Sequence, residues 1–127
     1  MKWTVNANRV AAGRKIEISG AWIGAELLIC ISGGDRPHIG STVQSVPRSS
    51  LTGDGHCSAT SSVLNITGHK DEVLCRYLAE LACSSLNTVV VCTGGVHVDL
   101  ASKEQLLEIQ KAVEEMGQEI VRRLKEQ

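Results

Sequence analysis

The chain has 127 residues, a formal net charge of -1, only 2% aromatic residues and no phenylalanine. This length suits a single domain over residues 1–127, with a core that buries roughly two-thirds of the surface of the unfolded chain. The balanced charge provides no basic field for polynucleotides or anionic membranes, and the scarcity of rings argues against a stacking platform for single-stranded nucleic acid.

The cysteines are odd in number and have no CxxC spacing, which is typical of buried thiols in a reducing cytoplasm; they are Cys30, Cys57, Cys75, Cys83 and Cys92. The chain shows neither a charged-then-apolar leader nor an apolar run near the roughly 18 residues that a membrane span needs. We therefore expect a soluble cytoplasmic protein that binds no membrane and no nucleic acid.

Four strands are predicted in the first half of the chain. Residues 14–24, RKIEISGAWIG, alternate apolar and polar side chains, the pattern of a half-buried strand. Residues 25–32, AELLICIS, are apolar at both odd and even positions and therefore predict a central strand covered on both faces. Residues 38–47 and 58–67 interleave Ser and Thr with aliphatic residues, which suits strands with one polar face, and residues 48–57 between them predict an exposed loop.

The second half predicts two helices around one strand. Residues 70–86 repeat apolar side chains at helical spacing, with Asp71 and Glu72 suited to the positive N-terminal end. The run TVVVCT predicts an interior strand, and Gly94-Gly95 followed by VHVDL predicts a kink or bulge in it. Ser102 and Gln105 form a capping box ahead of the clearest helix, whose apolar stripe comprises Leu106, Ile109, Val113, Met116, Ile120 and Leu124.

The predicted order is β-β-β-β-α-β-α. Consecutive strands joined by short turns favour a mostly antiparallel sheet with two helices packed on one face, an α+β fold. Because such a sheet leaves its other face partly bare, we expect self-association as a homodimer.

Glycine and histidine recur together at the predicted connections, and two of these segments also carry a cation. In Thr67-Gly68-His69-Lys70, unpaired N–H groups at a helix start, a glycine and an ammonium together suit a phosphate or carboxylate. In GGDRPHIG, residues 33–40, Arg36 is held by Pro37 and could be aimed for a bidentate contact. The alternative for both cations is an ordinary solvated surface charge.

Metal binding and nucleophilic catalysis have weaker support. His97 and Asp99 are two apart on one strand face, as ligands could be, but no HxxH, HExxH or Cys/His cluster accompanies them, and a hydrogen-bonding role for His97 is the alternative. His56 is a poor base for Cys57 because neighbouring strand residues point to opposite faces. We therefore predict no catalytic and no metal-ligating residue.

The blocks GGDRPHIG, SATSSVLNITGHKDE and VVVCTGGVHVD occur in order within the stretch from about Ile16 to Leu124, and there the chain resembles the LpdD-like family. The resemblance implies a small accessory protein of UbiD-type decarboxylases, with a fold related to proteasome-assembly chaperones. It implies a non-enzymatic chaperone that binds prenylated FMN after a flavin prenyltransferase has made it and assists its delivery to, or maturation in, the decarboxylase.

An anionic, bulky flavin requires a phosphate clamp and a wall, and we assign residues to these parts by position and chemistry. Arg36, Lys70 and the helix start would hold the phosphate, while Asp35, His38 and His97 would meet ribityl hydroxyls or ring heteroatoms. The whole predicted site comprises Gly34, Asp35, Arg36, Pro37, His38, Ser58, Thr60, Gly68, His69, Lys70 and His97.

Two other functions remain open. The chain could be a structural subunit of a decarboxylase complex that uses its bare sheet face for protein contacts. It could also be a small metal-dependent enzyme built on His38, His97 and Asp99.

Overall fold

A computed structural model of the chain describes residues 1–49, 57–66 and 70–127. In chain order, the described elements are β1 (Val5–Ala11), β2 (Arg14–Ile23), β3 (Glu26–Gly34), β4 (Ser41–Ser49), β5 (Cys57–Asn65), α1 (Lys70–Leu86), β6 (Val90–His97) and α2 (Lys103–Lys125).

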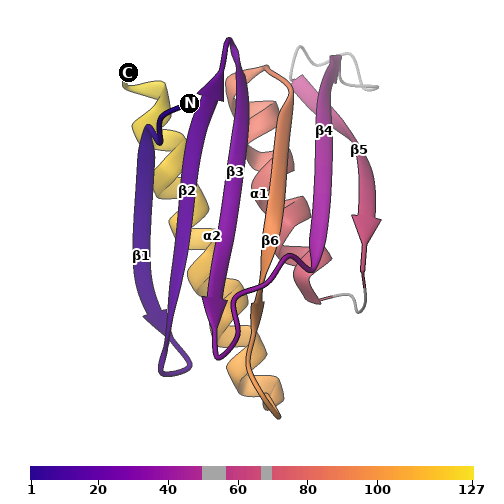
Figure 1. Cartoon of the computed structure of the whole chain (residues 1–127). Coiled ribbons are helices and arrows are strands. Elements are labelled where there is room, and N and C mark those ends of the chain that lie inside the picture. The colour runs from indigo at the N-terminus through magenta and orange to yellow at the C-terminus, as the bar shows by residue number, and fades with distance from the viewer. Residues whose placement is uncertain (50–56, 67–69) are drawn as a thin grey trace.

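The strands of the described residues form one six-stranded sheet in the order β1-β2-β3-β6-β4-β5 (Figure 1). All neighbouring pairs are antiparallel except β3 and β6, which are parallel. The predicted α+β class with a mostly antiparallel sheet is confirmed, as is the interior position of the strand after the first helix. Since β6 returns to the sheet between β3 and β4, it joins the two halves of the sheet.

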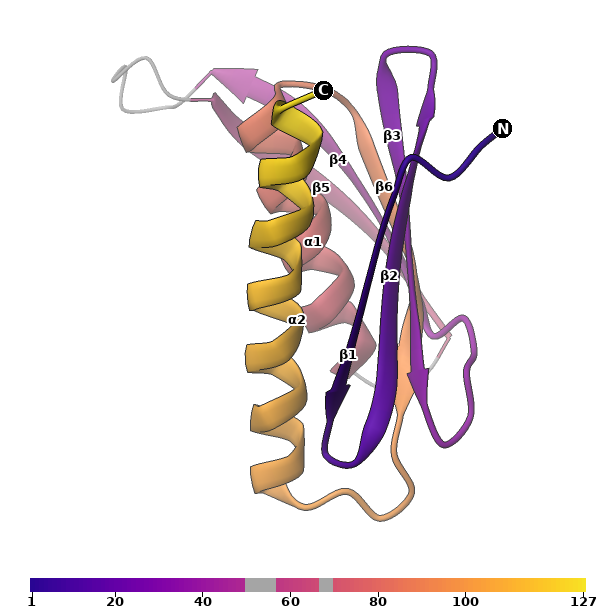
Figure 2. The ribbon, with the colours of Figure 1, turned by 90° about the vertical axis from the view of Figure 1, so that its left-hand side faces the viewer.

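Both helices pack on the same face of the sheet, and no element of the described residues covers the other face (Figure 2). The core lies between these layers, and its largest fully buried side chains include Ile16, Ile18, Ile29, Ile31, Met116 and Ile120. The predicted capping box is confirmed, because Ser102 accepts from the Gln105 backbone N–H and the Gln105 side chain accepts from the Ser102 backbone. The predicted stripe of α2 is buried in this core from Ile109 to Leu124.

Two features of the sheet differ from the prediction. Strand β1 was not predicted, because its segment VNANRVA alternates with asparagine and alanine rather than with large apolar residues; its inward side chains are small. Strand β3 is covered on one face only, because both helices lie on the same side and Leu28, Cys30 and Ser32 remain partly exposed on the other. The continuous apolar sequence of β3 thus reflects its position in the middle of the sheet and not a layer of helices on each face of the strand.

Of the kink or bulge predicted at Gly94-Gly95, the bulge is wrong. Strand β6 pairs with β3 in unbroken register from Val90 to His97, with Ile31 opposite Gly94. Gly94 has φ +132, a conformation that side chains disfavour, and a Cβ there would lie 1.8 Å from the carbonyl oxygen of Ile31. The glycine thus allows a close backbone approach within a continuous strand.

Candidate functional site

The parallel pairing of β3 and β6 brings two of the predicted site segments together. Because both strands end at the same edge of the sheet, Gly34 lies opposite His97. The connection from β3 to β4, residues 35–40, therefore starts beside the end of β6, at the lower end of the sheet in Figure 1. The first turn of α1 joins the same end through contacts of Asp71.

Asp35 ties three strand ends together. Its backbone N–H donates to the His97 carbonyl at 2.6 Å, one carboxylate oxygen accepts from Arg14 Nε at 3.0 Å, and the other accepts from the Asp99 backbone N–H at 2.9 Å. The hydrogen bond from the Arg14 guanidinium has the largest effect on the Asp35 carboxyl and lowers its pKa below the usual range. The hydrogen bond from the Asp99 backbone N–H lowers this pKa further. Both carboxylate oxygens thus already have protein partners.

Arg36 pairs with Asp99 and not with the adjacent Asp35. Its guanidinium donates to Asp99 Oδ1 at 2.8 Å and lies 3.0 Å from His97 Nε2, which is itself 2.9 Å from the same carboxylate oxygen. The hydrogen bond from His97, followed by the Arg36 guanidinium, lowers the pKa of the Asp99 carboxyl. The Arg36 side chain is 71% exposed, so this pair contributes little to stability but holds the cation in place.

His38 links this polar cluster to the start of α1. Its Nε2 lies 3.1 Å from Asp71 Oδ2, its Nδ1 lies 3.2 Å from the Arg36 carbonyl oxygen, and its ring meets the His97 ring edge-on at 5.9 Å between centroids. Asp71 is only 8% exposed, and its second carboxylate oxygen accepts from the Val96 backbone N–H at 3.0 Å. The cluster is therefore connected to the helix layer.

The lowered pKa values of Asp35 and Asp99 should make the fold sensitive to acid. A pKa that is lowered on folding stabilises the protein above the ordinary carboxyl range of about 4, and this contribution is lost as the pH falls through the lowered value. We expect Asp35→Asn to be less stable than the wild type at pH 7 in urea unfolding, and the difference to shrink between pH 5 and pH 3. A difference that stays constant over this range would show that Asp35 does not titrate as described.

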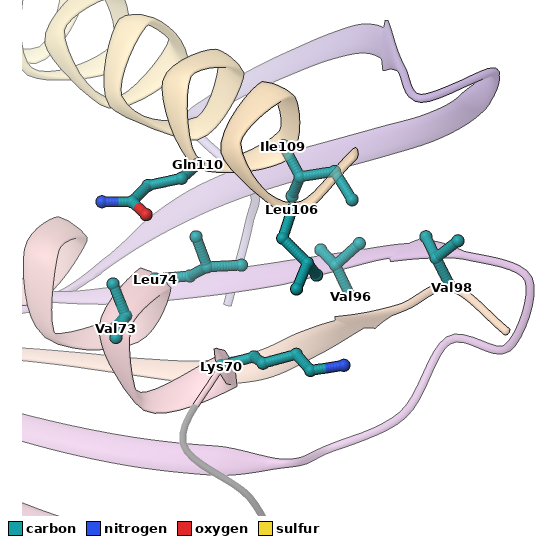
Figure 3. Close-up of a pocket in the computed structure, with 8 residues that line it drawn as sticks. All are labelled: Lys70, Val73, Leu74, Val96, Val98, Leu106, Ile109 and Gln110. Atoms are coloured by element: carbon teal, nitrogen blue, oxygen red, sulfur yellow. The ribbon is translucent and has the colours of Figure 1, made fainter. Parts of the chain in front are cut away.

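A cavity of about 270 Å³ lies between the two helices and the end of β6 (Figure 3). Its lining comes from the first two turns of both helices and from the end of β6 and the residue after it, and comprises Lys70, Val73, Leu74, Val96, Val98, Leu106, Ile109 and Gln110. Figure 3 shows the Lys70 side chain running along one side of the aliphatic group, away from the helix. Among the described residues, Lys70 makes no ion pair, so its charge is available to a ligand.

The end of β6 separates the cavity from the polar cluster. Val96 and Val98 belong to the core beneath the helices, whereas the His97 side chain between them contacts Arg36 and Asp99. Alternate strand residues point to opposite faces, so the cavity and the cluster occupy the two sides of the same strand end.

The structure gathers most of the predicted site residues at this end. Gly34 lies opposite His97, and the segment from Asp35 through Arg36, Pro37 and His38 follows it; Lys70 begins α1. Gly68 and His69 lie outside the described residues.

Ser58 and Thr60 are not brought to this end. They pair with Arg48 and Val46, toward the far end of β4, and Thr60 Oγ1 accepts from Arg48 Nε at 3.0 Å. The sequence GHCSATSS, residues 55–62, has a glycine beside a histidine, as the other predicted connections do. The positions of Ser58 and Thr60 along β5 nevertheless separate them from those connections.

Sequence reasoning missed the cavity and the role of Asp71. Val96 and Val98 were assigned no role, and Leu106 was assigned to a core stripe, although it is only partly buried. Asp71 was assigned to the helix dipole alone. The alternation Val-His-Val at a strand end was a usable signal, because it predicts one polar and one apolar side.

The structure places no metal cluster among the residues it describes: no three His, Cys, Asp or Glu side chains are grouped as ligands. All five cysteines are free thiols, and Cys75, Cys83 and Cys92 are buried. Neither helix of the described chain combines the length and apolar composition of a membrane span.

A family model described as prenylated flavin chaperone LpdD-like domain matches residues 11–125. The chain belongs to this family. The match confirms the resemblance carried by the GGDRPHIG and GHKDE blocks, and it covers every described element except β1, of which it includes only Ala11. No curated protein matches the chain in a sequence search.

The site fits the ligand class in the name of the LpdD-like family. A prenylated flavin nucleotide combines an anionic phosphate with hydrocarbon, and this end of the molecule combines the ammonium of Lys70 with an aliphatic cavity. Polar donors of the neighbouring cluster lie across the same strand end.

Proposed function

We propose that this protein is a non-enzymatic chaperone that binds prenylated FMN. The observation that carries the proposal is the aliphatic cavity with Lys70 along its side, in a chain of the prenylated flavin chaperone LpdD-like family. A carrier needs a clamp and a protecting wall, with no nucleophile.

Lys70 and the first turn of α1 are the proposed phosphate clamp. A helix N-terminus presents unpaired N–H groups and a partial positive charge, and an adjacent ammonium adds a charge-assisted hydrogen bond. Arg36 is proposed as an auxiliary cation. Because it already pairs with Asp99, a phosphate would have to compete with that carboxylate for it.

The remaining predicted residues support the clamp. His38 and His97 have ring edges near the strand end and are proposed to meet ribityl hydroxyls or ring heteroatoms, whereas Asp35 mainly fixes the loop. Gly34 and Pro37 set the path of the loop. Ser58 and Thr60 are left out of the proposed site because they lie along β5, away from it.

We propose that the protein acts in the cytoplasm, that a flavin prenyltransferase supplies the ligand, and that a UbiD-type decarboxylase receives it for delivery or maturation. The bare sheet face in Figure 2 supports a homodimer, which analytical ultracentrifugation tests. The same face favours the alternative of a structural decarboxylase subunit. That alternative requires stable co-purification with the large subunit and no flavin affinity of the isolated chain.

The proposal is tested by co-expression with a flavin prenyltransferase, followed by absorbance and mass spectrometry of the purified protein. We expect the purified protein to contain one bound prenylated FMN per chain. A colourless, ligand-free protein would refute the proposed chaperone function.

Lys70→Ala is expected to weaken prenylated FMN binding by about 1.5–3 kcal/mol, the scale of a charge-assisted hydrogen bond. Anaerobic titration calorimetry measures the loss. Lys111→Ala, which removes an exposed lysine from the middle of α2, is the matched control and should bind as the wild type does. Equal losses in both variants would show that only the overall charge matters.

A further inference from the structure

We propose that the aliphatic cavity holds the prenyl-derived hydrocarbon of the ligand, and that this contact selects prenylated FMN over FMN. The inference rests on the proposed function and adds the part of the ligand that the cavity recognises. It concerns the cavity lining, which none of the predicted site residues except Lys70 shares.

The chemistry of the lining favours hydrocarbon. Its described side chains are aliphatic apart from Lys70 and Gln110, and the Gln110 amide already donates to Glu114 at 3.3 Å. The pyrimidine edge of a flavin carries carbonyl and N–H groups, which would lose their hydrogen bonds to water without gaining enough partners here. A hydrocarbon group has no such groups to satisfy.

The size of the cavity points to part of a ligand. Its volume of about 270 Å³ is below the roughly 300–1,000 Å³ of pockets that enclose a whole drug-sized molecule. A flavin nucleotide exceeds that size class, whereas a five-carbon prenyl unit is well within it. The rest of the ligand must therefore lie outside the aliphatic group.

The positions of charge and rings agree with this division. No aromatic side chain is among the described residues that line the cavity, so the flavin ring would find no stacking partner inside it. The ammonium of Lys70 lies along one side of the cavity, where an anionic phosphate can approach without entering the apolar space (Figure 3). The ligand would thus place hydrocarbon inward and its charge at the edge.

Leu106→Gln tests the inference by placing an amide in the lining. Leu106 is in the first turn of α2 and is only partly buried, so helix α2 should tolerate the change. The matched control is Leu107→Gln, since Leu107 is the next residue, is 58% exposed and does not line the cavity. Thermal unfolding of each variant checks that the fold is retained.

The measurement is the affinity of each protein for prenylated FMN and for FMN by anaerobic titration. The wild type and Leu107→Gln should prefer prenylated FMN by about tenfold or more, and Leu106→Gln should reduce this ratio toward one by weakening prenylated FMN alone. Val73→Phe, which fills the cavity from a 45% exposed position on α1, should act in the same direction if Leu106→Gln fails to fold.

The outcomes separate the two proposals. This inference would be overturned, and the proposed function left intact, if the wild type bound prenylated FMN and FMN equally. The same holds if Leu106→Gln or Val73→Phe kept the preference of the wild type for prenylated FMN. A wild type that binds neither flavin would overturn both.

Discussion

Gly94→Ala is expected to destabilise the protein by about 3 kcal/mol or more. The added Cβ would lie 1.8 Å from the Ile31 carbonyl oxygen and 2.8 Å from its carbon, and both belong to the backbone of the parallel neighbour β3. No rotamer change relieves a clash with backbone, and the φ of +132 adds conformational strain. Urea unfolding followed by circular dichroism measures the loss.

Gly24→Ala separates strain from the clash. Gly24 also has a positive φ, of +62, but a Cβ there meets nothing within 4 Å. Its replacement should cost only about 1 kcal/mol, the scale of an alanine in the left-handed region. Similar losses for the two variants would contradict the close approach of β6 to β3.

Asp71→Ala is expected to cost about 3 kcal/mol, because it removes an acceptor from a buried backbone N–H and a partner from His38 at once. The carboxylate accepts from Val96 N–H at 3.0 Å and lies 3.1 Å from His38 Nε2, so it joins α1 to β6 and to the loop before β4. Loss of this contact should also speed amide hydrogen exchange at Val96, which is measured alongside urea unfolding.

Asp71→Asn is the matched control for the acceptor. Its side-chain oxygen can still accept from Val96, so the expected loss is smaller than that of Asp71→Ala. Asparagine also keeps the size of the aspartate side chain, which matters because the carboxylate packs closely against two glycines. A Cβ on Gly40 would lie 2.0 Å from Asp71 Oδ2, and a Cβ on Gly95 would lie 2.8 Å from Asp71 Cγ. Equal stability of Asp71→Ala and the wild type would show that water replaces the carboxylate without penalty.

The fold could be predicted largely because local signals and burial agree. The capping box at Ser102 and the stripe after it depend on residues a few positions apart, and α1 spans Lys70–Leu86 as its spacing predicted. Strand β1 escaped prediction because two of its buried side chains, Ala7 and Ala11, are small and carry little hydrophobic signal. The parallel placement of β6 depends on contacts distant in sequence, which no local pattern encodes.

The site was predictable only in part, for a similar reason. Glycine-rich connections marked the end of the sheet where Arg36 and Lys70 lie, but the identity of ion-pair partners is set by strand register. Asp35 therefore pairs with Arg14 of β2, and Arg36 with Asp99 beyond β6, instead of with each other. The cavity arises from three elements that meet in space, and periodicity cannot say which stripe residues border a gap.

The insertion of β6 between β3 and β4 also bears on the order of folding. Residues of β1 to β3 and of β4 to β5 can each form hairpins early, but nothing in the sheet joins these two groups until the strand from residue 90 onward is made. Contacts of such high sequence separation form late and slowly. The cavity and the polar cluster both depend on the end of that strand, so a nascent chain could form this end of the sheet only after the residues of β6 have been made.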